Sequence, residues 1–96
     1  MTTTQTTTRE TEIVTAHAIA EGSDWFIAVG RFTKSGQYFV ARGQGNTYMP
    51  IGVVHTTEAA ARAAANIEWT ADHASVTAQR AETVARIAAY EARRVA

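Results

Sequence analysis

Residues 25–43, WFIAVGRFTKSGQYFVARG, contain the two strongest strand patterns of the chain. Both runs, 25–33 and 37–43, are rich in the aromatic and β-branched residues that favour strands. Ser35-Gly36 lies between them, and a glycine at this place is typical of a tight hairpin. We therefore predict an antiparallel hairpin with a two-residue turn, in which Gly36 has a positive φ.

Two weaker strand patterns flank this hairpin. Residues 12–20 alternate loosely between apolar and polar side chains, and residues 47–55 form a second apolar run. Pro50 confines the second run to a sheet edge or a bulge, because proline cannot donate a hydrogen bond to a neighbouring strand. Turn residues separate the runs, so the pattern predicts an antiparallel β-meander of three to four strands.

A long helical pattern follows the predicted sheet. Thr56 or Thr57 can cap a helix, and Glu58 suits its positive end. No glycine or proline occurs after this point, so an unbroken helix would be about 58 Å long. Residues 70–77 contain several weak helix formers, and a continuous helix and one broken near 70–75 both remain open.

The predicted fold class is α+β: a three- to four-stranded antiparallel meander followed by a long alanine-rich C-terminal helix. We expect a single domain over residues 10–96, with the sheet in 10–55 and the helix in 57–95. Residues 1–9 are mostly threonine and have no apolar anchor, so we expect a flexible tail.

Composition limits the function classes. Lysine and arginine number 9, aspartate and glutamate also number 9, and the net charge is zero, whereas dedicated nucleic-acid binders usually carry a basic excess. The chain has no cysteine, which excludes disulfides and thiol nucleophiles. It has no secretory h-region and no apolar run of membrane-spanning length, so we expect a cytoplasmic protein without a membrane partner.

The predicted hairpin has two distinct faces. The first is aromatic at its ends and small in the middle, a shape that lets a helix approach closely: Phe26, Ala28, Gly30, Phe32, Phe39, Ala41 and Gly43. The second is a candidate partner-binding surface that includes Trp25, Arg31, Tyr38, Val40 and Arg42. The alternative is a half-covered sheet face whose arginines extend into solvent.

The predicted helix also has two faces. Alternating steps of four and three residues from Ala60 select an almost pure alanine series with the a/d spacing of a coiled coil. Its central members are the predicted self-association seam: Ala71, Ala74, Ala78, Ala81, Ala85 and Ala88. A second, larger face on the other side includes Trp69, Val76, Ile87 and Tyr90. The alternative is that alanine is abundant only because it is the best helix former.

Chemical motifs are weak. The spacing of His17, His55 and His73 matches no metal template, and the serines lie in no nucleophile context. The loop 43–46 is too short for a dinucleotide fingerprint. We therefore predict no catalytic residues, no metal site and no cofactor.

Residues 24–69 place a hairpin, a further strand and a helix in the order that resembles the arm-binding domains of tyrosine integrases. That resemblance implies a sheet that enters a DNA groove through Arg31, Lys34, Tyr38 and Arg42. The chain departs from the family because the family's sheet is strongly basic, so we assign no family.

The hypothesis from the sequence is a non-catalytic protein-binding module that self-associates, a homodimer acting as a small accessory or inhibitor protein of a phage or mobile element. The alternative is a nucleic-acid-binding accessory protein that uses Trp25, Arg31, Tyr38 and Arg42.

Overall fold

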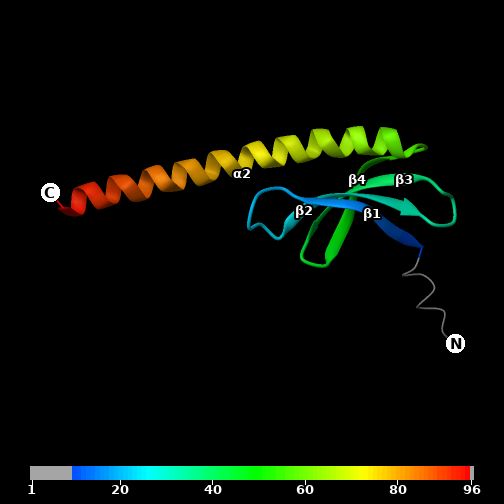
Figure 1. Ribbon diagram of the computed structural model, residues 1–96, viewed down its shortest axis with the longest axis horizontal. Helices are drawn as coiled ribbons and strands as arrows, with labels where there is room; N and C mark the ends of the chain where they lie inside the picture. The colour runs from blue at the N-terminus through cyan, green and yellow to red at the C-terminus, as the bar shows by residue number, and fades with distance from the viewer. Residues whose placement is uncertain (1–9, 96) are drawn as a thin grey trace, which may run out of the picture.

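The computed structural model describes residues 10–95 and shows four antiparallel strands followed by one long helix (Figure 1). The elements are β1 (Thr11–Ala18), β2 (Trp25–Phe32), β3 (Tyr38–Gln44), β4 (Thr47–His55) and α2 (Glu58–Val95). The strands lie in the order β1-β2-β3-β4, each beside its neighbour in sequence. The predicted α+β meander is confirmed, with four strands. The predicted tail, residues 1–9, lies outside the described residues.

The turn between β2 and β3 is longer than predicted. The Phe32 N–H donates to the carbonyl of Gln37 at 2.8 Å, which leaves a four-residue loop, 33–36, in place of a two-residue turn. Gly36 has a φ of 75°, as predicted. The longer loop offsets the strand pairing by two residues, so Arg31 pairs with Tyr38. Because side chains alternate with a period of two, the offset leaves each residue on its predicted face.

Phenylalanine rings fill the face of the sheet that carries the small residues. Gly30 pairs with Phe39, and a Cβ atom at Gly30 would lie 2.1 Å from the Phe39 Cζ atom. Gly43 pairs with Phe26 in the same way, and a Cβ atom at Gly43 would lie 2.3 Å from the Phe26 Cζ atom. The expectation that the helix packs on this face is wrong, because the space above each glycine holds a ring from the neighbouring strand.

The sheet curls around these rings. The hydroxyl groups of Thr11 on β1 and Tyr48 on β4 lie 2.8 Å apart, although β1 and β4 are the two edge strands. The Tyr48 ring stacks at 6.2 Å on that of Phe39, which is only 1% exposed. This concave face is therefore covered by its own side chains.

α2 packs on the opposite, convex face (Figure 1). Ile27 and Val40 are buried on the sheet, and Ala61 on the helix is fully buried. Partly buried apolar side chains complete this core: Ile51, Ala64, Ala65, Trp69 and Val76. An alanine at position 61 lets the helix backbone approach the sheet closely, so the N-terminal half of α2 is firmly placed.

α2 is continuous from Glu58 to Val95, which settles the question that the sequence left open. The Thr57 hydroxyl accepts a hydrogen bond from the Ala60 N–H at 3.2 Å and caps the helix start. The weak helix formers at 70–77 include Asp72 and His73, and both bond to the sheet side of the molecule. These contacts offset their low helix propensity.

Candidate interaction surfaces

Arg42 on β3 is the polar anchor between sheet and helix. Its guanidinium donates to both carboxylate oxygens of Asp72, at 2.8 and 3.2 Å, and to Glu68 at 3.0 Å. The hydrogen bond to Asp72 is the largest influence that raises the pKa of Arg42 above its usual value. The geometry is bidentate, so it fixes the register of α2 on the sheet.

The predicted sheet face is therefore mostly occupied by α2. Val40 is 2% exposed beneath the helix, whereas Trp25 remains exposed. Arg31 donates to Glu12 on β1 at 2.8 Å. Tyr38 is half-buried. The structure brings these residues to one face but leaves only part of it accessible.

Lys34, a further basic residue of the supposed DNA-binding set, lies 3.5 Å from the Glu10 carboxylate. With Arg31 on Glu12 and Arg42 on Asp72, each of these cations has a carboxylate partner. The convex face thus offers little free positive charge to phosphates.

The second predicted helix face has a part that packs on the sheet and a part that is exposed. Trp69 packs on the core and donates its indole N–H to the Ala18 carbonyl at 2.8 Å, and its ring stacks on His73 at 4.6 Å. Val76 is the last residue of this face that packs on the core. Ile87 and Tyr90 lie beyond the sheet and are 56% and 55% exposed.

The C-terminal half of α2, residues 77–94, extends away from the sheet, and every residue in it is exposed (Figure 1). We call this segment the overhang. It is about 27 Å long at ~1.5 Å per residue. The Cα radius of gyration, 18.6 Å, greatly exceeds the ~12–13 Å of a compact domain of this length.

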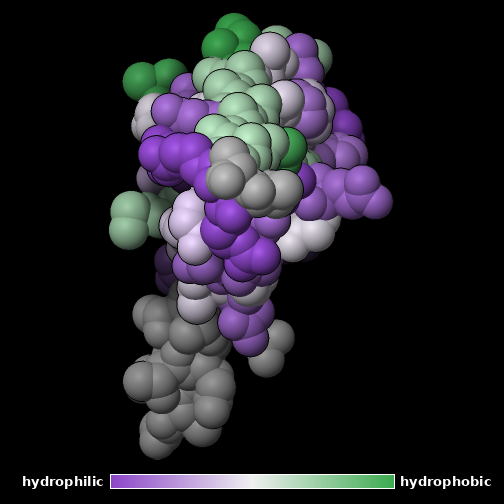
Figure 2. Space-filling view, turned by 90° about the vertical axis from the view of Figure 1, so that its left-hand side faces the viewer, coloured by the Kyte–Doolittle hydropathy of each residue, from purple (hydrophilic) through white to green (hydrophobic). Residues whose placement is uncertain are grey.

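The predicted alanine seam lies on the side of α2 that faces away from the sheet. Its six residues are all exposed: Ala71, Ala74, Ala78, Ala81, Ala85 and Ala88. Figure 2, seen from the C-terminal end, shows a pale green apolar stripe along the helix between purple hydrophilic flanks. The sheet therefore leaves this seam free along its length.

A surface that the sequence analysis missed lies on β4. Ile51 and Val53 border the groove between α2 and this edge strand, and Met49 lines a neighbouring hollow of the sheet with Arg42. Met49 and Val53 are 69% and 72% exposed. Ala64 and Glu68 form the helix side of the groove. We call this region the β4 surface. The alternation of apolar residues at 49, 51 and 53 was the available signal.

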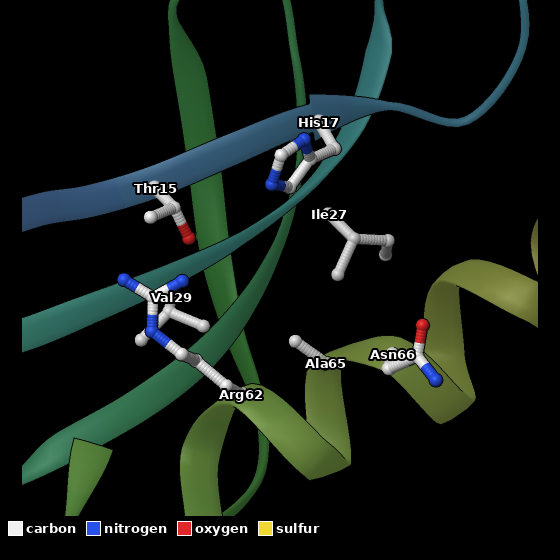
Figure 3. Close-up of a pocket in the computed structure, with 7 residues that line it drawn as sticks. All are labelled: Thr15, His17, Ile27, Val29, Arg62, Ala65 and Asn66. Atoms are coloured by element: carbon white, nitrogen blue, oxygen red, sulfur yellow. The ribbon is translucent and has the colours of Figure 1, made fainter. Parts of the chain in front are cut away.

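A small pocket of about 140 Å³ lies on the other flank, between β1 and α2 (Figure 3). The strands contribute Thr15, His17, Ile27 and Val29, and α2 contributes Arg62, Ala65 and Asn66 from the opposite side. The Arg62 guanidinium is bound to Glu58 at 2.6 Å, so its charge is already compensated. The pocket holds no nucleophile paired with a base.

Within residues 10–95, no group of three or more His, Cys, Asp or Glu side chains is placed to hold a metal ion. In the same part of the chain, no helix is both long and apolar enough to cross a membrane. The exposed hydrophobic residues of α2 and the extended shape suggest a partner or an oligomer.

Comparisons with protein-family models, with curated proteins and with solved structures found no match to this chain. The likeness to integrase arm-binding domains remains one of element order, and the fold and its surfaces carry the functional argument.

Proposed function

We propose that the protein is a non-catalytic protein-binding module that acts by self-association through the exposed half of α2. The observation that carries this proposal is the overhang, in which every residue from 77 to 94 is exposed. Most helix stability in proteins comes from the packing of an apolar face, and an isolated helix of this length is marginal in water. A partner that covers the overhang supplies that packing.

The large apolar side chains of the overhang supply most of the binding energy. Val84, Ile87 and Tyr90 are all more than half exposed. Burial of one such side chain contributes about 1.5–3 kcal/mol, whereas an alanine contributes much less. The larger residues therefore stabilise the contact more than the alanine seam does, and the seam lies on the other side of α2 from Ile87 and Tyr90.

We do not propose the nucleic-acid function, because Arg31, Lys34 and Arg42 each have a carboxylate partner. Phosphate binding would require these pairs to be exchanged, with little net gain.

The test compares Ile87→Glu with Thr77→Glu, a matched charge addition at an exposed polar position of the same helix. Light scattering after size exclusion is expected to give a dimer mass for the parent and for Thr77→Glu, and a monomer mass near 10.4 kDa for Ile87→Glu. Glutamate favours helices, so the circular dichroism of each folded variant should keep its helical signal. A parent that is monomeric at high micromolar concentration contradicts the proposal.

A further inference from the structure

This chain leaves two apolar surfaces exposed, one on the C-terminal half of α2 and one on β4. The overhang carries Ile87 and Tyr90, and the convex side of the sheet carries the β4 surface beside the N-terminal half of α2. Within one chain the overhang cannot contact the β4 surface, because the overhang extends away from its own sheet (Figure 1).

The side of α2 that faces the sheet in the N-terminal half continues along the overhang. Ile87 follows Trp69 by 18 residues and Tyr90 follows Asp72 by 18 residues, which is about five turns at 3.6 residues per turn. Trp69 and Asp72 both face the sheet. The sheet-facing side of α2 thus continues through Ile87 and Tyr90 without a sheet beneath it.

We propose that a second copy of the chain covers both surfaces, with the two α2 helices side by side and antiparallel over their full length. In this dimer the overhang of each copy lies on the β4 surface of the other. This arrangement rests on the proposed self-association and specifies its geometry. It extends the sheet–helix interface already present in each chain, so that each sheet carries its own helix start and the helix end of its partner.

The overlap of the two antiparallel α2 helices over their full length determines which residues of the two copies lie side by side. The midpoint of Glu58–Val95 lies near residue 77, so Ile87 and Tyr90 of one copy come level with residues 63–67 of the other. Ala64 and Glu68 border the β4 surface at that level. In this register the apolar residues of the overhang therefore lie against the β4 surface of the other copy.

Side-chain size also fits. Charge gives no separate support, because Arg86 already pairs with Glu82 at 3.3 Å and Glu68 with Arg42 at 3.0 Å within each chain. Ala64 and Ala71 lie on this flank and allow close helix contact. A standard interface buries about 800 Å² per partner, and two helices about 57 Å long in contact, with each overhang on a sheet, offer a contact of that order.

Spin-label distances test the geometry on the full chain. The protein has no cysteine, so Thr77→Cys and Glu91→Cys each give one labelling site per chain. Both positions are exposed, and Glu91 lies 18 residues, about five turns, after His73, which bonds to Ile19 on the β1 side. Glu91 lies one turn after Ile87 but on the flank of α2 away from the groove with β4, so its label lies at the edge of the proposed contact.

The expected intermolecular distance is short, about 20 Å, for Thr77 and long, about 45 Å, for Glu91, from ~1.5 Å per residue on either side of the midpoint. Equal distances would show a parallel pair, and a shorter distance at Glu91 than at Thr77 would show that only the overhangs pair. Either result overturns this geometry while self-association stands. Absence of any intermolecular distance overturns self-association as well.

A substitution on the sheet gives an independent readout. Val53→Glu is expected to weaken dimerisation by more than about tenfold, whereas the apolar control Val53→Ile keeps the dimer. Val53 is largely exposed in the single chain, so its replacement leaves the monomer fold intact. A dimer unaffected by Val53→Glu contradicts the placement of the overhang on the β4 surface.

Discussion

Replacement of Gly30 by alanine tests the packing of the concave face. The new methyl group would lie 2.1–2.7 Å from three atoms of the Phe39 ring. This ring is 1% exposed and lies 4.8 Å from the ring of Phe32, so it has little room to move. The variant must therefore displace a buried aromatic side chain or the strand itself.

The expected cost follows from two opposing effects. Overpacking of a core costs about 1–3 kcal/mol. Alanine recovers roughly 0.5–1 kcal/mol of the backbone entropy that glycine loses on folding. Because the clash is with a buried ring, the overpacking cost lies at the upper end, about 2–3 kcal/mol, and the net loss is about 1–2.5 kcal/mol. This corresponds to a decrease in Tm of roughly 4–20 °C for a chain of this size.

Thermal unfolding by circular dichroism at one fixed protein concentration measures this shift, because the stability of an associating protein depends on concentration. Phe39→Leu removes the ring atoms that clash, so the double variant should be more stable than the sum of the two single effects by about 0.5–3 kcal/mol. A neutral or stabilising Gly30→Ala, or strictly additive effects, would refute the ring-over-glycine packing.

Three further substitutions or deletions test other parts of the fold. Gly36→Val is expected to cost about 1–3 kcal/mol through backbone strain alone, because Gly36 has a φ of 75° and no atom within 4 Å of an added Cβ; an unchanged Tm in thermal unfolding counts against this turn. Arg42→Gln should lower Tm by more than Arg31→Gln does, because Arg42 binds Asp72 bidentately and the Arg31 pair is a single surface contact; equal shifts contradict the anchoring role. Deletion of residues 1–9 should change Tm by no more than about 2 °C, and a larger fall would show that the segment is docked on the domain.

The strands and the helix were predictable because their signals are local. Aromatic and β-branched residues are frequent in 25–33 and 37–43, and the absence of glycine and proline after Thr57 favours one helix. The continuity of that helix was not predictable, because Asp72 and His73 depend on Arg42 and Ile19, which lie far away in sequence.

The face on which the helix packs was predicted incorrectly for a specific reason. A two-residue turn would pair Phe39 with Phe32 and leave Gly30 open, which suggested room for a helix. The observed four-residue loop pairs Phe39 with Gly30 and Phe26 with Gly43. An aromatic ring opposite a glycine is a known way to fill such a gap, so the correct register would have predicted the outcome.

The candidate surfaces were only partly predictable. The helical period separated the alanine side from the Trp69–Tyr90 side, but it cannot show where the sheet ends beneath the helix. Val76 marks that end, and this position depends on the anchor between Arg42 and Asp72. The exposure of Ile87 and Tyr90 therefore follows from tertiary structure.

Hydrogen–deuterium exchange of the unmodified protein tests most directly whether the exposed half of α2 is an interface. Exchange is measured by mass spectrometry at low and high micromolar concentration, with peptides that cover residues 77–94. An unpartnered helix of this length opens readily, so protection that increases strongly with protein concentration is predicted for these peptides, with little change for β2 and β3. Exchange in 77–94 that is equally fast at every concentration would contradict self-association through α2.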